Sequence, residues 1–211
     1  LWTEFWAAWR GGARTAAEAP IENACALRVL DDGKHFVTAV APPHRPVNYA
    51  MTVLSLDTLA VACVLRLASK VWSVATHGVL IACGCEDGTI HLHREAAGGG
   101  SFAPLGPLPE GHRGHVFGLA MRGDVLVSGG AGDGLVKVWS VGRRTCTATL
   151  REHTSWVYAV EIGEAAIASG GLDNTARLWP LEGGGESLHK LQHPSFVLAL
   201  AMDGDLLATG C

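Results

Sequence analysis

One spacing of histidine, serine, aspartate and tryptophan recurs in the second half of this chain, about every 40 residues. The histidines are His112, His153 and His193, and each is followed four positions later by a valine that opens an apolar run. A repeat of this length cannot bury its own apolar faces, so it must stack on copies of itself. The sequence therefore predicts an array of similar units.

Each unit has the pattern of short strands joined by tight turns. Apolar residues alternate with polar ones in stretches bounded by Gly, Asp and Asn, which is typical of half-buried strands in hairpins. In the units that begin at His112 and His153, a turn containing aspartate leads to a third strand with a tryptophan, and a fourth strand is expected at 146–150 and 187–191. Four short strands in about 40 residues correspond to one propeller blade.

On these residues the sequence resembles the WD40 repeat family. The family's histidine is matched in all three units, and its serine, aspartate and tryptophan are matched in the first two. The resemblance implies a hydrogen-bonded tetrad in each complete unit, because a buried imidazole needs partners for both ring nitrogens. The implied structural tetrads are His112, Ser128, Asp133 and Trp139, and His153, Ser169, Asp173 and Trp179.

The upstream units depart from this pattern. The unit at about 67–94 keeps an Asp-Gly turn, but Leu67, Cys83 and His93 stand where the tetrad needs histidine, serine and tryptophan. Neither complete unit has the aspartate that follows the family's tryptophan.

An earlier stretch has strand-like segments at 24–30, 35–41 and 50–56 and no tetrad. We therefore expect an all-β WD40 β-propeller over residues 21–211, with about four blades and part of a fifth. Because a propeller must close to protect its edge strands, we also expect that further blades are missing from this chain.

The first 20 residues form a separate segment. Trp2, Phe5, Trp6 and Trp9 have the spacing of one face of a short amphipathic helix, and an Ala- and Gly-rich connector follows. An aromatic helix directly before WD40 repeats is similar to the end of an F-box in F-box/WD-repeat proteins, the substrate-recognition subunits of cullin-RING ubiquitin ligases. The alternative is a helix that packs on the side or bottom of the propeller.

Composition excludes several classes of function. The net charge is −4 and the basic residues are scattered, which argues against a nucleic-acid partner. No apolar run approaches the ~18 to 20 residues of a membrane helix, so no membrane association is expected. The six cysteines show no CxxC motif, which favours free thiols and an intracellular location, cytoplasmic or nuclear.

No pattern of catalytic residues is present. Cys83, Cys85, His91 and His93 lie on the two arms of one expected hairpin, as a zinc site would require, but two of them already occupy tetrad positions. The Gly-rich strings lack the Lys-Ser/Thr ending of a phosphate-binding loop, and no nucleophile elbow is found. We therefore expect no enzyme activity, no metal and no cofactor.

What remains is a binding surface. In WD40 relatives the loops at one end of the propeller, the top face, usually contact the partner, and the resemblance implies a protein or peptide partner there. The candidate partner-binding residues are Lys70, Glu86, Arg113, His115, Thr154, Trp156, Leu172 and Phe196. Tryptophan, phenylalanine and arginine often dominate interface energies. The basic candidates would suit an acidic or phosphorylated peptide. The alternative for Trp156 and Phe196 is that they only cover the ends of strands.

Three functions are compatible with this reading. The chain is expected to be a protein-interaction scaffold without catalysis. The first alternative is an F-box/WD-type substrate-recognition adaptor of a ubiquitin ligase, and the second is a regulatory subunit of another assembly.

Overall fold

The computed structural model describes residues 24–40, 49–97 and 100–211. Within these residues the chain forms 18 strands, arranged in four four-stranded antiparallel sheets and one hairpin. The expected all-β propeller with four blades and part of a fifth is therefore confirmed. The aromatic helix and connector expected at 1–20 lie outside the described residues.

The strands follow one another in sequence order within each blade. Blade 1 comprises β1 (Ala24–Val29), β2 (His35–Val40), β3 (Tyr49–Ser55) and β4 (Val61–Leu67). Blade 2 comprises β5 (Val71–His77), β6 (Leu80–Cys85), β7 (Ile90–Glu95) and β8 (Phe102–Pro107). Blade 3 comprises β9 (Val116–Arg122), β10 (Val125–Gly130), β11 (Val136–Ser140) and β12 (Thr145–Leu150). Blade 4 comprises β13 (Val157–Ile162), β14 (Ala166–Gly171), β15 (Thr175–Pro180) and β16 (His189–Gln192). The partial blade 5 comprises β17 (Ala199–Asp203) and β18 (Leu206–Gly210).

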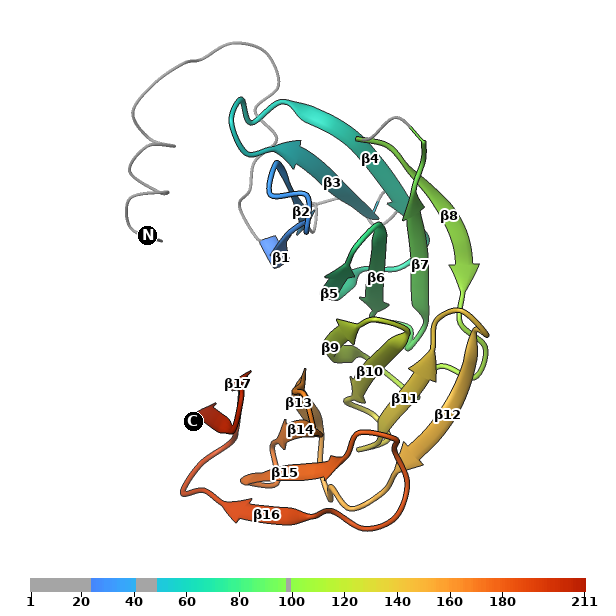
Figure 1. Ribbon diagram of the computed structural model, residues 1–211. Helices are drawn as coiled ribbons and strands as arrows, with labels where there is room; N and C mark the ends of the chain where they lie inside the picture. The colour runs from blue at the N-terminus through green and yellow to red at the C-terminus, as the bar shows by residue number, and fades with distance from the viewer. Residues whose placement is uncertain (1–23, 41–48, 98–99) are drawn as a thin grey trace.

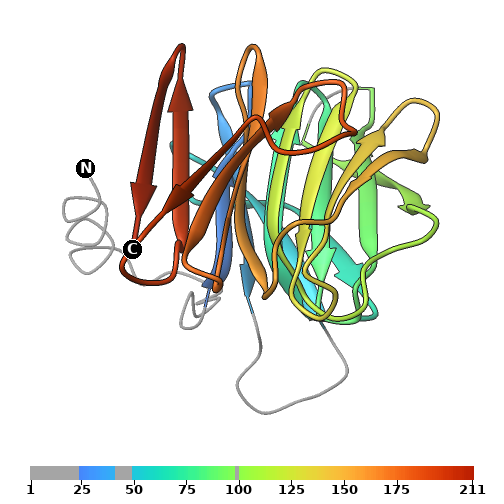
Figure 2. The same cartoon turned by 90° about the horizontal axis from the view of Figure 1, so that it is seen from below.

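The blades form an arc around a common axis (Figure 1). The first strand of each blade lies on the inside, where β1, β5, β9, β13 and β17 follow one another, and the fourth strand lies on the outside. Figure 2 shows the blades edge-on. Because the strands are antiparallel, each inner strand begins at the same end of its blade as the turn between the second and third strands. This end is the top face.

The tight turns contain residues that tolerate a positive φ angle. Gly88 and Gly134 have φ values of 86° and 64° in the Asp-Gly turns of blades 2 and 3. Asn174 takes the equivalent place in blade 4 with a φ of 61°. Asparagine tolerates this conformation better than most residues, so the Asp-Asn turn can replace Asp-Gly.

A glycine near the end of each second strand allows the next blade to approach. A Cβ atom on Gly84, Gly129 or Gly170 would lie 2.5–2.7 Å from a Cγ atom of a valine at or just before the start of the following inner strand. Those valines, at positions 116, 157 and 197, are fully buried. The glycine near the end of each of these second strands and the valine that follows each histidine are therefore two sides of one contact between blades.

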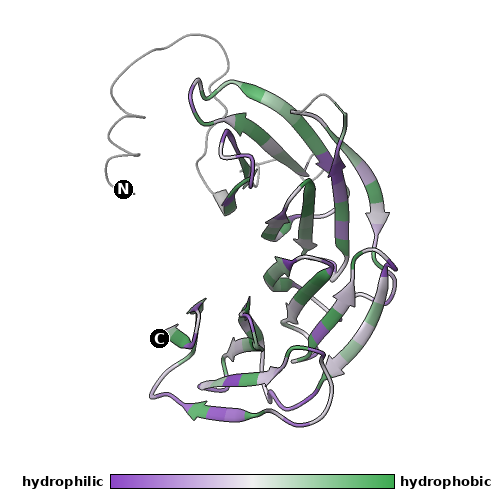
Figure 3. Cartoon of the chain, viewed as in Figure 1, coloured by the Kyte–Doolittle hydropathy of each residue, from purple (hydrophilic) through white to green (hydrophobic). Residues whose placement is uncertain are grey.

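The apolar core lies between and within the blades. Trp139 and Trp179 are among the largest fully buried side chains. Figure 3 shows hydrophobic residues along the second strands β6 and β10, whereas β7 and the outer strand β16 carry more hydrophilic ones. The outer strand of blade 4 begins two residues later than expected, at His189, and that of blade 3 begins one residue earlier, at Thr145.

Candidate partner-binding face

Blade 3 brings its four tetrad residues together as a chain of hydrogen bonds. The indole Nε1 of Trp139 donates to Ser128 Oγ over 2.9 Å, and Ser128 Oγ lies 2.7 Å from His112 Nε2. His112 Nδ1 lies 3.1 Å from both carboxylate oxygens of Asp133. Because the carboxylate only accepts, Nδ1 carries the proton, and Ser128 donates its hydroxyl proton to Nε2. Each polar side-chain group of these four residues therefore has a hydrogen-bond partner.

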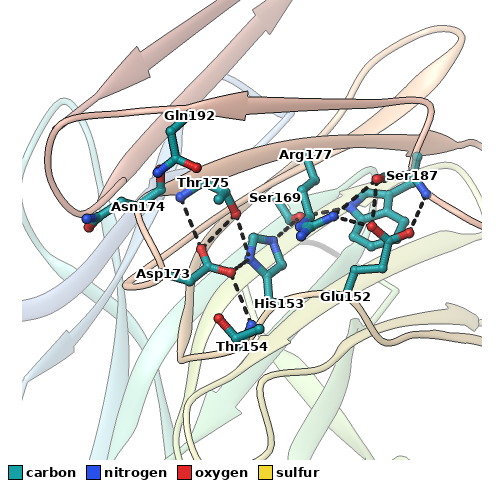
Figure 4. A network of polar contacts seen from close by, with 11 residues as sticks. Glu152, His153, Thr154, Ser169, Asp173, Asn174, Thr175, Arg177, Ser187 and Gln192 are labelled. Carbon is teal, nitrogen blue, oxygen red and sulfur yellow. Dashed lines mark hydrogen bonds and ion pairs between the residues drawn. The ribbon is translucent and has the colours of Figure 1, made fainter.

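Blade 4 repeats this arrangement (Figure 4). Trp179 Nε1 donates to Ser169 Oγ over 2.8 Å, and that oxygen lies 2.7 Å from His153 Nε2. His153 Nδ1 lies 2.9 Å from Asp173 Oδ2. The Asp173 carboxylate also accepts the backbone N–H groups of Thr154 and Thr175, so it holds the turn and the top-face loop as well as the imidazole.

A second polar cluster closes blade 4 on its outer side (Figure 4). Arg177, which is buried, pairs with Glu152, the residue just before the tetrad histidine. The Glu152 carboxylate also accepts the backbone N–H of Ser187 over 2.6 Å and its hydroxyl over 2.8 Å. This cluster fixes the segment that leads to β16 against the loop that leads to β13.

The electrostatics agree with an ionised aspartate in each complete tetrad. Burial alone would raise the pKa of Asp133, but hydrogen bonds from His112 and from backbone N–H groups outweigh it and hold the pKa at about 2. Burial also raises the pKa of Asp173, but the hydrogen bond from the Thr175 hydroxyl, the neighbouring His153 and the backbone N–H of Thr154 together lower it. Burial lowers the pKa of His153, and the neighbouring Asp173 opposes this shift only in part.

Blade 2 keeps two members of the tetrad in altered form. Cys83 and His93 occupy the serine and tryptophan positions, and Cys83 Sγ lies 3.7 Å from His93 Nδ1. Burial raises the pKa of Cys83 and brings that of Cys85 to about 12, so both thiols are protonated and unreactive. Within the described residues, no three His, Cys, Asp or Glu side chains are placed to hold a metal ion.

The structure places the eight candidate residues at the top face but does not join all of them. Lys70 Nζ lies 3.6 Å above the ring of Trp72, and His115 Nδ1 lies 2.8 Å from the backbone oxygen of Glu86. Trp156 and Phe196 are 45% and 49% exposed, and no ring contact to Phe196 is found within the described residues. Of the remaining candidates, Arg113 and Thr154 are exposed and Leu172 is half-buried.

Sequence analysis missed three aromatic residues that connect this face. Trp72, Phe117 and Tyr158 are each the second residue of an inner strand. In each strand the pairing register shifts at that residue, so it is the extra residue of a β-bulge. A bulge turns a side chain away from the regular pleat. The sequence pattern that marks these residues is a valine followed by an aromatic residue, and it occurs at the start of three successive inner strands.

These three residues join His115 and Trp156 in one surface, which we call the aromatic ledge. Phe117 is its centre, with ring centroids 5.3 Å from Trp72, 5.5 Å from His115, 6.0 Å from Trp156 and 4.6 Å from Tyr158. The Phe117 and Tyr158 rings are stacked, and the Trp72 and Phe117 rings meet edge to face. The ledge crosses blades 2, 3 and 4, and each of its rings packs against Phe117.

Comparison with known proteins gives a family match. The sequence matches the family described as "WD domain, G-beta repeat" over residues 61–94, 104–140 and 144–180, about half of the chain. Each matched segment runs from the outer strand of one blade through the third strand of the next.

Individual relatives cover part of the chain. It is 31% identical over 104 residues to the DENN domain and WD repeat-containing protein SCD1 of Arabidopsis thaliana, covering 48% of this chain and 9% of that protein. It is 28% identical over 132 residues to human F-box/WD repeat-containing protein 9, covering 57% of this chain and 29% of that protein. The crystal structure of the computationally designed Ika8 protein has a TM-score of 0.71 and 26% identity, covering 88% of this chain and 54% of that one. The chain thus spans less than a third of these two natural relatives. No helix in the described part of the chain is long and apolar enough to cross a membrane.

Proposed function

Because the chain belongs to the WD40 repeat family, we propose that it is a protein-interaction scaffold that binds a protein or peptide at its top face and catalyses no reaction. The observation that carries this proposal is the aromatic ledge. Five rings meet across three blades, and Trp156 at its edge leaves 45% of its surface exposed. Exposed aromatic side chains that are held rigid lose little entropy on binding and are common anchors of interfaces.

The setting we propose is intracellular, in the cytoplasm or nucleus. The described cysteines, at positions 63, 83, 85, 146 and 211, are free thiols, which supports a reducing compartment.

The test is a selection of random nine-residue peptides, displayed on phage, against the full chain. We expect Trp156→Ala to weaken the selected peptides by about 30-fold or more, since removing an interface anchor costs about 2 kcal/mol. Its exposed position means that the fold is retained. Val79→Ala is the matched control, because Val79 is a 51% exposed apolar residue in the β5–β6 turn at the opposite end of the blades.

Trp179→Ala is a second control. This tryptophan is fully buried in the blade 4 tetrad, so its variant should lose binding only together with a loss of folding. Peptides that bind the Trp156→Ala variant as well as the original chain would rule out the top face as the binding surface.

The second candidate function is a substrate-recognition adaptor of a ubiquitin ligase. Two observations favour it: the aromatic segment at 1–10 resembles the end of an F-box, and the chain is similar to an F-box/WD repeat-containing protein. Gel filtration of the full-length protein with a purified cullin-RING ligase core tests this function. Co-elution supports the adaptor, whereas separate elution leaves the scaffold.

A further inference from the structure

The aromatic ledge carries hydrogen-bond donors that nothing in the described residues accepts. The indole Nε1 of Trp72 is buried and has no partner there. The Lys70 ammonium lies over the Trp72 ring and makes no hydrogen bond or ion pair with a described residue, and the Tyr158 hydroxyl makes none either. His115 has already used its Nδ1 proton on the backbone oxygen of Glu86. A ligand that fits this surface must offer apolar area and acceptors together.

A proline-rich segment has this combination. In the polyproline II conformation the backbone makes no internal hydrogen bonds, so its carbonyl groups remain free to accept. Proline lacks an N–H group, so the segment brings few donors that would need acceptors on the ledge. Its rings are flat and apolar, and aromatic-lined surfaces bind such segments because little conformational entropy is lost.

The dimensions of the ledge agree with such a ligand. The steps from Trp72 to Phe117 and from Phe117 to Trp156 are 5.3 Å and 6.0 Å between ring centroids. Each step is shorter than the roughly 9 Å of one polyproline II turn, which has three residues with a rise of about 3.1 Å each. Two neighbouring rings of the ledge can therefore contact one turn of such a segment.

The charges near the ledge are mixed. Lys70, which lies over the Trp72 ring, and exposed Arg113 are positive, whereas the exposed side chains of Glu86 and Asp87 in the adjacent turn are negative. A peptide rich in carboxylates or phosphates would meet charges of both signs, whereas proline carbonyl groups carry no net charge. We therefore propose that the aromatic ledge binds a proline-rich segment of a partner protein in the polyproline II conformation. This inference rests on the proposed partner-binding function and names its ligand.

The direct test uses fluorescently labelled decaproline as the probe, titrated with the full chain and followed by anisotropy. Phe117→Ala removes the centre of the ledge and should weaken binding by about 10-fold or more. Trp72→Phe and Tyr158→Phe keep a ring but remove one donor each, and each should weaken binding by about 2- to 10-fold. These conservative variants keep the test decisive if Phe117→Ala does not fold. Val79→Ala should bind as the original chain does.

A ten-residue Gly-Ser peptide and a ten-residue peptide with alternating glutamates are the matched probes, and both should bind at least 10-fold more weakly than decaproline. The assignment would be overturned if decaproline did not bind. It would also be overturned if the Phe117→Ala and Trp72→Phe variants bound decaproline as tightly as the original chain does.

The two proposals fail in different ways. Selected peptides that depend on Trp156 but are acidic and contain no proline would overturn the polyproline ligand and leave the top-face function standing. A selection that returns no peptide sensitive to any ledge variant would overturn both.

Discussion

Trp139 and Trp179 begin two chains of donated hydrogen bonds that run in one direction, from indole through serine and histidine to aspartate. In each chain the aspartate is the only member that cannot donate, so it fixes the tautomer of the histidine. In blade 3, removing it leaves the buried Nδ1–H of His112 without an acceptor, whereas in blade 4 the Thr175 hydroxyl also lies 3.4 Å from His153 Nδ1. The carboxylate therefore determines whether the histidine is fully satisfied, and the bonds of the serine and the indole do not involve it.

The first prediction at this scale concerns Asp173→Ala. The change strips His153 and two backbone N–H groups of their acceptor, and we expect a loss of about 1 to 3 kcal/mol, the usual cost of an unsatisfied buried polar group. Urea unfolding of the chain and its variant measures this loss.

Asp87→Ala is the matched control. Asp87 holds the same turn in blade 2, where its carboxylate accepts only from Thr89 and no tetrad histidine is present. Its loss should be clearly smaller. Equal losses would mean that both aspartates act only as turn residues.

At the scale of the elements, the second strand of one blade packs closely on the inner strand of the next because a glycine in the second strand has no side chain. Gly129 in β10 leaves room for Val157 of the next blade. The outer strands have no such requirement and are more exposed, and β16 is exposed over its whole length.

At this scale we predict that Gly129→Ala destabilises the chain by about 1 to 3 kcal/mol, as overpacking usually does. The new Cβ would lie 2.6 Å from a Cγ atom of Val157 and would push blade 4 away from blade 3. Thermal or urea unfolding measures the effect.

Gly210→Ala changes the equivalent residue of β18, where the nearest atom to a new Cβ is 3.3 Å away. Its stability should change by less than about 0.5 kcal/mol. The explanation fails if the two variants lose the same stability.

Sequence analysis could predict the strands and the residues of the two complete tetrads because both recur with the period of the fold. The altered pair of blade 2 could also be located, since Cys83 and His93 stand at the same spacing. The aromatic ledge could not be predicted, because it depends on a register shift at Phe117 and its equivalents. A shift of one residue reverses the face on which a side chain lies, and spacing alone does not reveal it.

In the molecule as a whole, the contacts between blades are contacts between successive blades, since each blade packs on the blades before and after it. Blade 5 is a hairpin with its apolar side chains largely uncovered. Leu206 is 74% exposed, and Phe196 and Leu198 are 49% and 47% exposed. Apolar residues beside an unpaired strand edge favour association with another chain.

We therefore predict that residues 1–211 alone self-associate at micromolar concentration and that Leu206→Lys reduces this association. A charge on the exposed hairpin opposes edge pairing. Sedimentation velocity measures the distribution of species.

Val79→Lys places the same charge on an exposed apolar residue of the β5–β6 turn, far from the hairpin, and should leave the association unchanged. A chain that sediments as a monomer without any substitution would contradict the prediction.

The contact between Gly84 and Val116 has a consequence for synthesis. Blade 2 has no complete tetrad, and its Ser73 hydroxyl donates to the backbone oxygen of Val116, in the blade that follows. At about 5 to 20 residues per second, a ribosome needs roughly 2 to 6 seconds to proceed from Cys85 to Val116. During that interval the nascent second strand has no neighbour on the face that Val116 later covers, so that face is exposed while the chain is being made.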